Sequence, residues 1–265
     1  MENAVIVETV ELPWEEDNTN ALAFIPASNR KISSSLAIFA HGYTSHKASI
    51  LNWAARLSEE GIPSLIFDLP GHFLGNFSRV SSFESFKSKA PRLFQESRQV
   101  MLKLIQKHHS NYSSQRLIVG GHSLGALLAL KSLDLPYFQS IETQAICVGL
   151  GLPAKGKVHL FDTPFYKSTL ALRAQFVDSS LAPEKVFPWI KEEKEQMKIK
   201  NKNIYFLTGK DDLVVGNDGT ERLADHLEKL GNNTVIEKPT KLPHHQPEMA
   251  AAHIKKFLKT KGYFS

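Results

Sequence analysis

The sequence predicts an α/β fold, in which a mostly parallel eight-stranded sheet is covered by helices on both faces. Along most of the 265 residues, short apolar runs alternate with amphipathic helical segments. Such alternation is typical of parallel strands that are joined by helices and buried on both sides. The first two strands are expected at residues 4–12 and 21–26, and the polar stretch between them indicates an antiparallel hairpin.

The later elements follow in a regular order. Six short apolar runs predict the remaining strands, at residues 36–40, 64–67, 117–119, 146–150, 204–207 and 234–237. Helices are expected at residues 50–60, from about residue 91, and at residues 124–133, 220–230 and 247–258. Gly61 and Gly231 directly follow two of these helices, where glycine commonly ends a helix.

Residues 152–203 interrupt this alternation. The segment mixes helical and loop patterns and contains four prolines. A structureless connection of this length is uncommon in a compact domain, so it predicts a small helical cap inserted into a core domain formed by residues 1–151 and 204–265. Its aromatic residues are expected either to line a pocket or to pack the cap onto the core. They are Phe161, Phe165, Tyr166, Phe176, Phe187 and Trp189.

The composition excludes several classes of function. Hydrophobic residues make up 42% and charged residues 22% of the chain, and the formal net charge is +5. No Lys/Arg block forms a basic arm, so nucleic acid is not an expected partner. The chain has a single cysteine, Cys147, so a disulfide framework is excluded. Cys147 lies in an apolar run. With no signal peptide and no membrane-length apolar run visible, we expect a cytoplasmic protein without stable membrane insertion.

Ser123 is the candidate nucleophile. The strand predicted at residues 117–119 runs directly into Gly-Gly-His-Ser-Leu-Gly at residues 120–125, and an apolar helix follows at once. This is a Gly-x-Ser-x-Gly motif between a strand and a helix, the context in which a sharp turn exposes the serine hydroxyl. Glycines beside such a turn let strand and helix approach closely, and the helix N-terminus directs N–H groups toward the reacting oxygen. The alternative is that Ser123 is an ordinary helix cap.

Three further motifs follow other predicted strands. They are Ala-His-Gly-Tyr-Thr at residues 40–44, Asp-Leu-Pro-Gly-His at 68–72 and Gly-Lys-Asp-Asp-Leu-Val at 209–214. Together with the serine motif, and in this order, they resemble serine hydrolases of the α/β-hydrolase superfamily over nearly the whole chain, especially small bacterial carboxylesterases with a helical cap. The resemblance implies an α/β-hydrolase fold and hydrolysis of a small-molecule carboxylic ester, with no cofactor.

The resemblance also implies an acid and then a histidine after the serine. The family's acid usually follows the strand-end glycine by three residues, which is Asp212, with Asp211 as the alternative. The histidine follows the last strand, where His244 is favoured over the adjacent His245. Pro243 stands where the family typically has a glycine, so both histidines stay open as candidates. The acid would orient the imidazole and stabilise the imidazolium as it forms.

An oxyanion hole requires two N–H donors aimed at the developing negative charge. The resemblance assigns them to the backbones of Tyr43 and Leu124, so the side chain at position 43 is free to vary. His41 is expected to brace this loop, and His72 to be structural. The family often continues Gly-x-Ser after the latter histidine, whereas Phe-Leu-Gly follows here at residues 73–75.

The predicted reaction is acyl transfer to water through an acyl-enzyme formed on Ser123. The same machinery serves thioesterases, lipases and peptidases, and these remain alternatives, as does a ligand-binding protein with a hydrolase fold. The paired aspartates and histidines also suggest a metal site, but a triad explains the same residues without an ion. The sequence makes no prediction about the acyl group or the oligomeric state.

Overall fold

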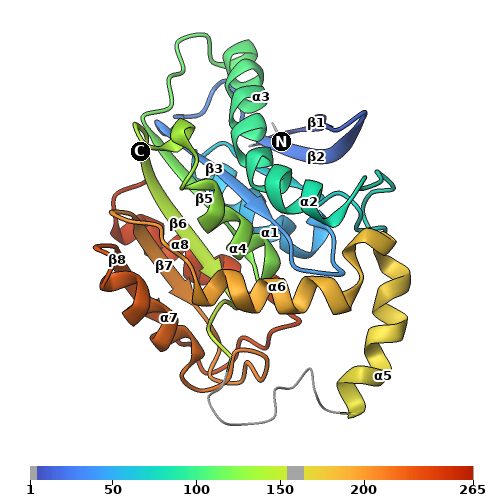
Figure 1. The fold of residues 1–265 in the computed structure, drawn as a ribbon. Helices are drawn as coiled ribbons and strands as arrows, with labels where there is room; N and C mark the ends of the chain where they lie inside the picture. Colours follow the sequence, from blue (N-terminus) through green and yellow to red (C-terminus); the bar gives the residue numbers. More distant parts are fainter. Residues whose placement is uncertain (1–4, 154–163, 265) are drawn as a thin grey trace.

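The structure is a computed structural model that describes residues 5–153 and 164–264, without the side chains of Phe165 and Tyr166. Its centre is an eight-stranded sheet with the order β1-β2-β4-β3-β5-β6-β7-β8 (Figure 1). The strands are β1 (Val5–Trp14), β2 (Asp17–Pro26), β3 (Ser35–Ala40), β4 (Ser64–Phe67), β5 (Arg116–His122), β6 (Glu142–Val148), β7 (Asn203–Leu207) and β8 (Asn233–Glu237). β2 pairs antiparallel with β1 and β4, and the other neighbours are parallel. The predicted fold class is confirmed.

The N-terminal hairpin is longer than its sequence pattern indicates. Only Glu15 and Glu16 connect the two strands, so the polar residues 17–20 lie within β2 and not in a loop. Glu15 has a φ of 49°, which suits a two-residue hairpin turn. The polar residues fit a strand because most of them face solvent, while Thr19 between them is buried.

The helices divide between the two faces of the sheet (Figure 1). The described ones are α1 (Leu51–Glu59), α2 (Phe83–Lys89), α3 (Leu93–His108), α4 (Leu124–Ser132), α5 (Pro164–Arg173), α6 (Pro183–Glu195), α7 (Gly219–Glu228) and α8 (Ala251–Thr260). α1 and α8 pack on one face, in a buried cluster that includes Trp53 and Ile254. α3, α4 and α7 pack in a second buried cluster that includes Phe94, Leu127 and Leu223. None of the described helices is both long and apolar enough to cross a lipid bilayer.

Helix α2 is not predicted by the sequence pattern. Ser82 caps its start by accepting a hydrogen bond of 3.1 Å from the Ser85 N–H at its hydroxyl oxygen. The helix has 7 residues, of which Phe86 alone is buried. One buried position is too few to produce a recognisable helical period, so the capping serine was the available signal.

Helices α5 and α6 lie between β6 and β7 in the chain, within the segment predicted to form a cap. α6 crosses near the carboxyl ends of the central strands, and α5 stands beside it (Figure 1). Trp189 of α6 is buried against Phe83 and Phe86, with ring centroids 5.7 and 6.4 Å away. The division into a core and a cap at residues 152–203 stays a prediction, and residues 154–163 of that segment lie outside the described residues.

Candidate active site

Ser123 lies on the turn between β5 and α4, in a strained backbone conformation. Its φ is 49° and its ψ is −108°, a combination that non-glycine residues rarely adopt. The surrounding backbone holds it there, because the Ser123 N–H donates to Val148 O at 2.9 Å and the Leu127 N–H donates to Ser123 O at 3.0 Å. Residues 120–125 therefore form a sharp turn from strand to helix.

Gly121 and Gly125 let β3, β5 and α4 meet at this turn. A Cβ added at Gly121 would lie 2.3 Å from Ala40 O, and one added at Gly125 would lie 2.2 Å from the same atom. Both separations are far below van der Waals contact, so a side chain at either position would push β3 away. The two glycines thus bring the loop after β3 against the first turn of α4.

Ser123 directly precedes the first turn of α4. Ser123 is half-buried, and its hydroxyl makes no hydrogen bond to another residue that the structure describes. Leu124 is the first residue of α4, so its N–H has no partner within the helix. The helix dipole adds a partial positive charge at the same place. This end of α4 can therefore stabilise a negative oxygen that forms next to Ser123.

Asp212 and His244 are joined by a hydrogen bond at the carboxyl edge of the sheet. His244 Nδ1 lies 2.9 Å from Asp212 Oδ2, and the two side chains are 8% and 1% exposed. Asp212 Oδ1 accepts two further hydrogen bonds of 3.0 Å, from the N–H groups of Val214 and Val215. The carboxylate is therefore fixed in place. Because Nδ1 of a neutral His244 donates to it, Nε2 is the nitrogen that can accept a proton.

Asp211 and His245 take different positions. Asp211 is exposed, and its Oδ1 accepts a hydrogen bond of 2.8 Å from the Leu242 N–H. His245 is also exposed, and its ring meets that of His244 edge to face, with centroids 5.6 Å apart. The structure thus joins Asp212, and not Asp211, to His244. Within the described residues, no group of three or more His, Cys, Asp or Glu side chains is arranged to hold a metal ion.

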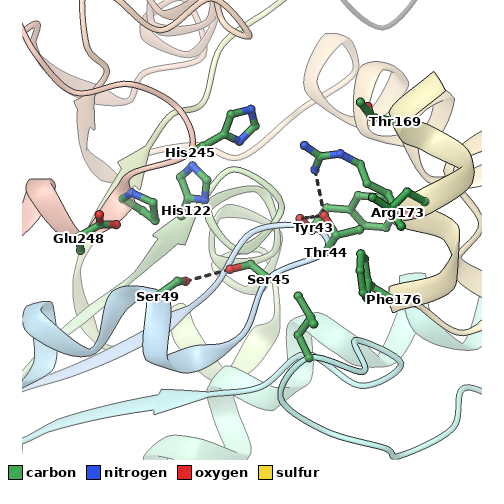
Figure 2. Close-up of a pocket in the computed structure, with 13 residues that line it drawn as sticks. Tyr43, Thr44, Ser45, Ser49, His122, Thr169, Arg173, Phe176, His245 and Glu248 are labelled. Atoms are coloured by element: carbon green, nitrogen blue, oxygen red, sulfur yellow. Dashed lines mark hydrogen bonds between the residues drawn. The ribbon is translucent and has the colours of Figure 1, made fainter. Parts of the chain in front are cut away.

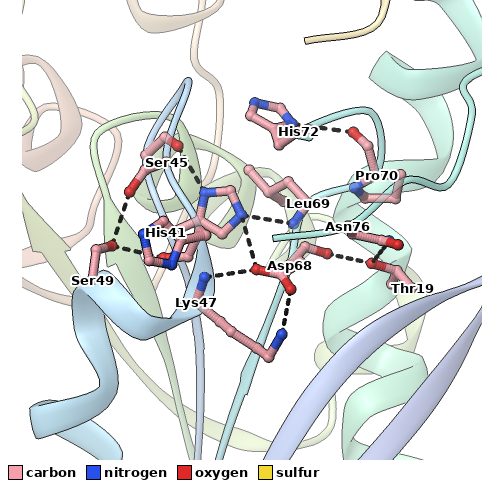
Figure 3. A network of polar contacts seen from close by, with 12 residues as sticks. Thr19, His41, Ser45, Lys47, Ser49, Asp68, Leu69, Pro70, His72 and Asn76 are labelled. Atoms are coloured by element: carbon pink, nitrogen blue, oxygen red, sulfur yellow. Dashed lines mark hydrogen bonds and ion pairs between the residues drawn. The ribbon is translucent and has the colours of Figure 1, made fainter. Parts of the chain in front are cut away.

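A buried polar network supports the loop after β3 (Figure 3). His41 Nδ1 donates to Gly42 O at 2.8 Å, and His41 Nε2 accepts from the Leu69 N–H at 2.9 Å. Burial lowers the pKa of the His41 imidazole to about 3, so the ring is neutral and keeps both bonds at pH 7. Asp68 accepts from the N–H and the Nζ of Lys47 at 2.7 and 2.5 Å. His41 in this position holds the loops after β3 and β4 together.

The loop after β4 contains the second buried histidine. His72 Nδ1 donates to Pro70 O at 3.1 Å, and burial lowers the pKa of this imidazole to about 3. Gly75, in the stretch that departs from the family pattern, allows the Asp68 carboxylate to approach, since a Cβ there would lie 2.3 Å from Oδ1. Leu74 beside it is exposed at the cavity described below. The altered loop therefore packs against the supporting network and contributes an apolar side chain.

Tyr43 is anchored by its side chain beside the N-terminus of α4. Its hydroxyl donates to Leu181 O at 2.7 Å. Its ring lies against His72 and Phe187, with centroids 5.7 and 5.2 Å away. Because the loop that carries Tyr43 lies against the first turn of α4, the backbones of Tyr43 and Leu124 belong to neighbouring segments.

A cavity of about 470 Å³ opens beside these residues (Figure 2). Tyr43, His122 and His245 line one side of it, and α5 with the turn that follows lines the other. Ser123 and His244 are not part of the lining, but each is the chain neighbour of a histidine that is. The cavity therefore lies directly next to the candidate catalytic residues.

The aromatic residues of the predicted cap divide between the two expected roles. Phe176 lines the cavity. Phe187 packs on Tyr43, and Trp189 packs on the core. Phe161 and the side chains of Phe165 and Tyr166 lie outside the described residues.

His122 is a buried member of the serine motif that the sequence analysis does not single out. Both of its ring nitrogens are buried and have no hydrogen-bond partner among the residues that the structure describes. Its ring lies 4.7 Å from that of His244, and a Cβ at Gly42 would be 2.5 Å from its Nδ1. Burial, followed by repulsion from His244 and His245, lowers the pKa of this imidazole well below its usual value. A neutral ring with two unpartnered nitrogens is uncommon in a protein interior, and it lies here at the wall of the cavity.

Comparison with known proteins identifies a family and solved structures that are similar to this chain. The family model described as serine aminopeptidase, S33, matches residues 33–204, which is more than half of the chain. A search of curated proteins finds no match. An esterase from Pyrobaculum calidifontis is 14% identical with a TM-score of 0.67, and the match covers 97% of this chain and 86% of that one.

Two further solved structures have the same fold. A carboxyl esterase from Bacillus coagulans, in complex with glycerol, is 15% identical with a TM-score of 0.63, covering 97% of this chain and 98% of that one. A thioesterase domain from the curacin biosynthetic pathway is 17% identical with a TM-score of 0.62, covering 96% and 99%. The α/β-hydrolase fold and the hydrolase class predicted from the sequence are confirmed, and the esterases among these structures agree with the resemblance to carboxylesterases. The chain belongs to the serine aminopeptidase S33 family of α/β hydrolases.

Proposed function

We propose that this chain is a serine hydrolase that cleaves carboxylic esters, with Ser123 as nucleophile, His244 as base and Asp212 as the acid that orients it. The observation that carries the proposal is the hydrogen bond of 2.9 Å between Asp212 and His244, on the loops after β7 and β8. The strained turn at Ser123 and the chain order of serine, acid and histidine support it. Membership of a hydrolase family supports it as well.

The first step transfers the acyl group to the enzyme. Ser123 Oγ attacks the acyl carbon, and its proton passes to His244 Nε2. The Asp212 carboxylate stabilises the imidazolium through Nδ1–H. The carbonyl oxygen becomes an oxyanion, which the N–H groups of Leu124 and Tyr43 would bind. The bond from the acyl carbon to the leaving oxygen then breaks, and the leaving oxygen takes the proton from His244 and departs as an alcohol.

Water completes the cycle. His244 Nε2 takes a proton from a water molecule as its oxygen attacks the acyl carbon of the acyl-enzyme. The bond to Ser123 Oγ breaks, the serine recovers its proton from His244, and the carboxylic acid is released. The hydroxyl of Ser123 is not hydrogen-bonded to His244 in the structure. Such bonds are often long in unliganded enzymes and tighten when substrate binds.

Thioesters and peptides are the specific alternatives for the same residues. The family description names an aminopeptidase, and one matched structure is a thioesterase domain. We favour oxygen esters because the motifs resemble carboxylesterases and two of the matched structures are esterases. A cavity of about 470 Å³ suits a small molecule. We also propose that residues 152–203 serve as its cap, since α5 lines the cavity, and that the enzyme acts in the cytoplasm.

Replacing Ser123 with alanine tests the proposal most directly. Ser123→Ala should reduce hydrolysis of 4-nitrophenyl butyrate by at least about 10³-fold, because no other group can form the acyl-enzyme. It should also abolish labelling by a fluorophosphonate probe. Ser88→Ala, which removes an exposed hydroxyl on α2, is the matched control and should retain both. Turnover or labelling of Ser123→Ala at the wild-type level would contradict the proposal.

A substrate panel distinguishes the alternatives. Oxygen esters, thioesters and aminoacyl 4-nitroanilides with matched acyl groups should be compared by kcat/KM. We expect the highest value for an oxygen ester. A higher value for the thioester would make the chain a thioesterase, and a higher value for the anilide would make it a peptidase.

A further inference from the structure

Arg173 extends into the cavity from the end of α5 (Figure 2). Thr169, Leu172 and Phe176 line the cavity with it. The spacing of three and four residues places Thr169, Leu172 and Arg173 on one side of α5, and Phe176 lies on the 3-10 turn that follows. The end of α5 and this turn therefore present one cation and two apolar side chains to the ligand.

A hydrogen bond connects Arg173 to the loop after β3, which carries Tyr43. Its Nη1 donates to Thr44 Oγ1 at 3.0 Å, and Thr44 Oγ1 donates in turn to Tyr43 O at 2.7 Å. Thr44 has a φ of 56°, so the chain turns sharply directly after Tyr43. The guanidinium is thus held close to the proposed oxyanion hole. A substrate group that binds to it would be only a short chain away from the carbonyl under attack.

Arg173 places a positive charge at the end of the cavity that α5 lines. The pKa values of His122 and His245 are both lowered, chiefly by burial and then by the neighbouring histidines, so both rings are neutral at pH 7. The charge of Arg173 contributes to this effect on His245. Among the described residues that line the cavity, Glu248 supplies the other charge, and Figure 2 shows it on the far side of His122 and His245 from Arg173. The cavity therefore presents a cation at the α5 end and an anion at the opposite end.

We propose that Arg173 binds a carboxylate of the substrate, so that the ester cleaved by this chain carries a free carboxylate on a short apolar chain. The inference rests on the proposed ester hydrolysis for its chemistry. A guanidinium presents two parallel N–H donors that match the two oxygens of a carboxylate. Leu74 and Leu172 are 49% and 56% exposed at the cavity, and an apolar chain would cover them.

Two matched pairs of esters test this site. One pair places the charge on the acyl side, with mono-4-nitrophenyl adipate against 4-nitrophenyl adipamate. The other places it on the leaving group, with 4-acetoxybenzoate against 4-acetoxybenzamide. In at least one pair, kcat/KM should be about tenfold higher for the carboxylate, as expected for one charge-assisted contact. The pair that shows the preference identifies the side of the ester that faces Arg173.

Variants assign the preference to Arg173. Arg173→Gln should bring the ratio within the pair close to one, and Arg173→Lys should retain part of it because the charge remains. Thr44→Val removes the hydrogen bond to the guanidinium without removing its charge, and should keep the preference. Lys167→Gln removes an exposed cation from the same helix and should change neither rate nor ratio. Equal rates within both pairs, or an unchanged ratio in Arg173→Gln, would overturn the inference.

Binding measurements separate this inference from the proposed function. Ser123→Ala lacks the nucleophile, so calorimetry can follow the intact esters on it. At least one carboxylate ester should bind about tenfold more tightly than its amide, and Ser123→Ala/Arg173→Gln should bind both equally. Equal binding by Ser123→Ala would overturn the carboxylate site alone. A clear difference in binding without hydrolysis by the wild-type chain would retain that site and overturn the ester hydrolase.

Discussion

The loops after β7 and β8 each carry two neighbouring residues of one type. Asp212 and His244, which are hydrogen-bonded to each other, form an inner pair. Asp211 and His245, whose side chains contact other residues, form an outer pair. The side chain of the inner aspartate is 1% exposed and makes three hydrogen bonds, one of them to its histidine. The outer aspartate is exposed and bonds to a backbone N–H, and its histidine is exposed at the cavity. Adjacent residues of the same type thus differ in burial and in hydrogen-bond partners, because their side chains face in different directions. Burial and fixed donors distinguish a carboxylate that orients an imidazole from one that only ties two loops together.

The largest expected effect follows from removing the charge of the inner pair. Asp212→Asn should lower kcat on a 4-nitrophenyl ester by about 10⁴-fold, because an amide cannot stabilise the imidazolium and favours the wrong tautomer of His244. Asp211→Asn should change kcat little. Steady-state kinetics on both variants gives the comparison, and equal losses would show that the two aspartates are not distinguished in this way.

The two adjacent histidines, His244 and His245, allow the same comparison between the inner and the outer pair. His244→Gln should reduce kcat on the same scale as Asp212→Asn, since the two act as one unit. His245→Gln should act mainly on KM, because its ring lines the cavity. A loss of kcat confined to His245→Gln would transfer the role of base to the outer histidine.

A second effect concerns the two fully buried histidines beside the candidate active site, His41 and His72. Burial lowers the pKa values of His41 and His72 to about 3, whereas an imidazole in the unfolded chain titrates near about 6.5. The unfolded state therefore binds more protons between these values. The stability that depends on the neutral rings is complete above about pH 6.5 and is lost as the pH falls toward 3.

Urea unfolding at two pH values measures this effect. Between pH 7 and pH 5, each of the two rings should lower the free energy of unfolding by about 2 kcal/mol. In His72→Leu, which removes one of the rings, the difference between the two pH values should shrink by the contribution of that ring, about 2 kcal/mol. A free energy of unfolding that does not change over this range would contradict the expected role of buried neutral histidines.

The smallest effect concerns the outer aspartate and stability. Asp211→Ala removes the acceptor of the Leu242 N–H and should lower the free energy of unfolding by about 1 kcal/mol. Asp225→Ala, on the exposed face of α7, is the matched control and should change it by less than about 0.5 kcal/mol. Equal results for the two variants would mean that the Leu242 bond contributes no net stability.

The fold was predictable where the structure buries both faces of a strand. Such strands contain a continuous apolar run, as at residues 117–119 of β5 and 145–148 of β6, so they stand out between helices. The hairpin and α2 were harder because each is stabilised by a few contacts to the rest of the chain. The polar residues 17–20 are held in β2 by pairing with β1, and α2 is held by Phe86. Neither interaction leaves a periodic pattern in its own segment.

The residues of the candidate site also differ in how far the sequence predicts them. The turn at Ser123 was predictable because Gly121 and Gly125 are required locally by the approach of β3. Choosing between adjacent histidines was not, since it depends on which ring the turn at Pro243 directs toward Asp212. Arg173 was missed because only the docking of α5 brings it to the loop after β3. Its residue type and spacing are those of an ordinary helix surface.

The backbone of Ser123 also bears on how such a chain evolves. A φ of 49° at a serine costs about 1–3 kcal/mol of folding free energy, and glycine at this position would relieve much of it. A variant that has lost this proposed nucleophile can therefore be more stable than the parent chain. Selection for stability alone would remove the serine. Its retention requires that the two buried clusters on either side of the sheet provide enough margin to keep a strained residue folded.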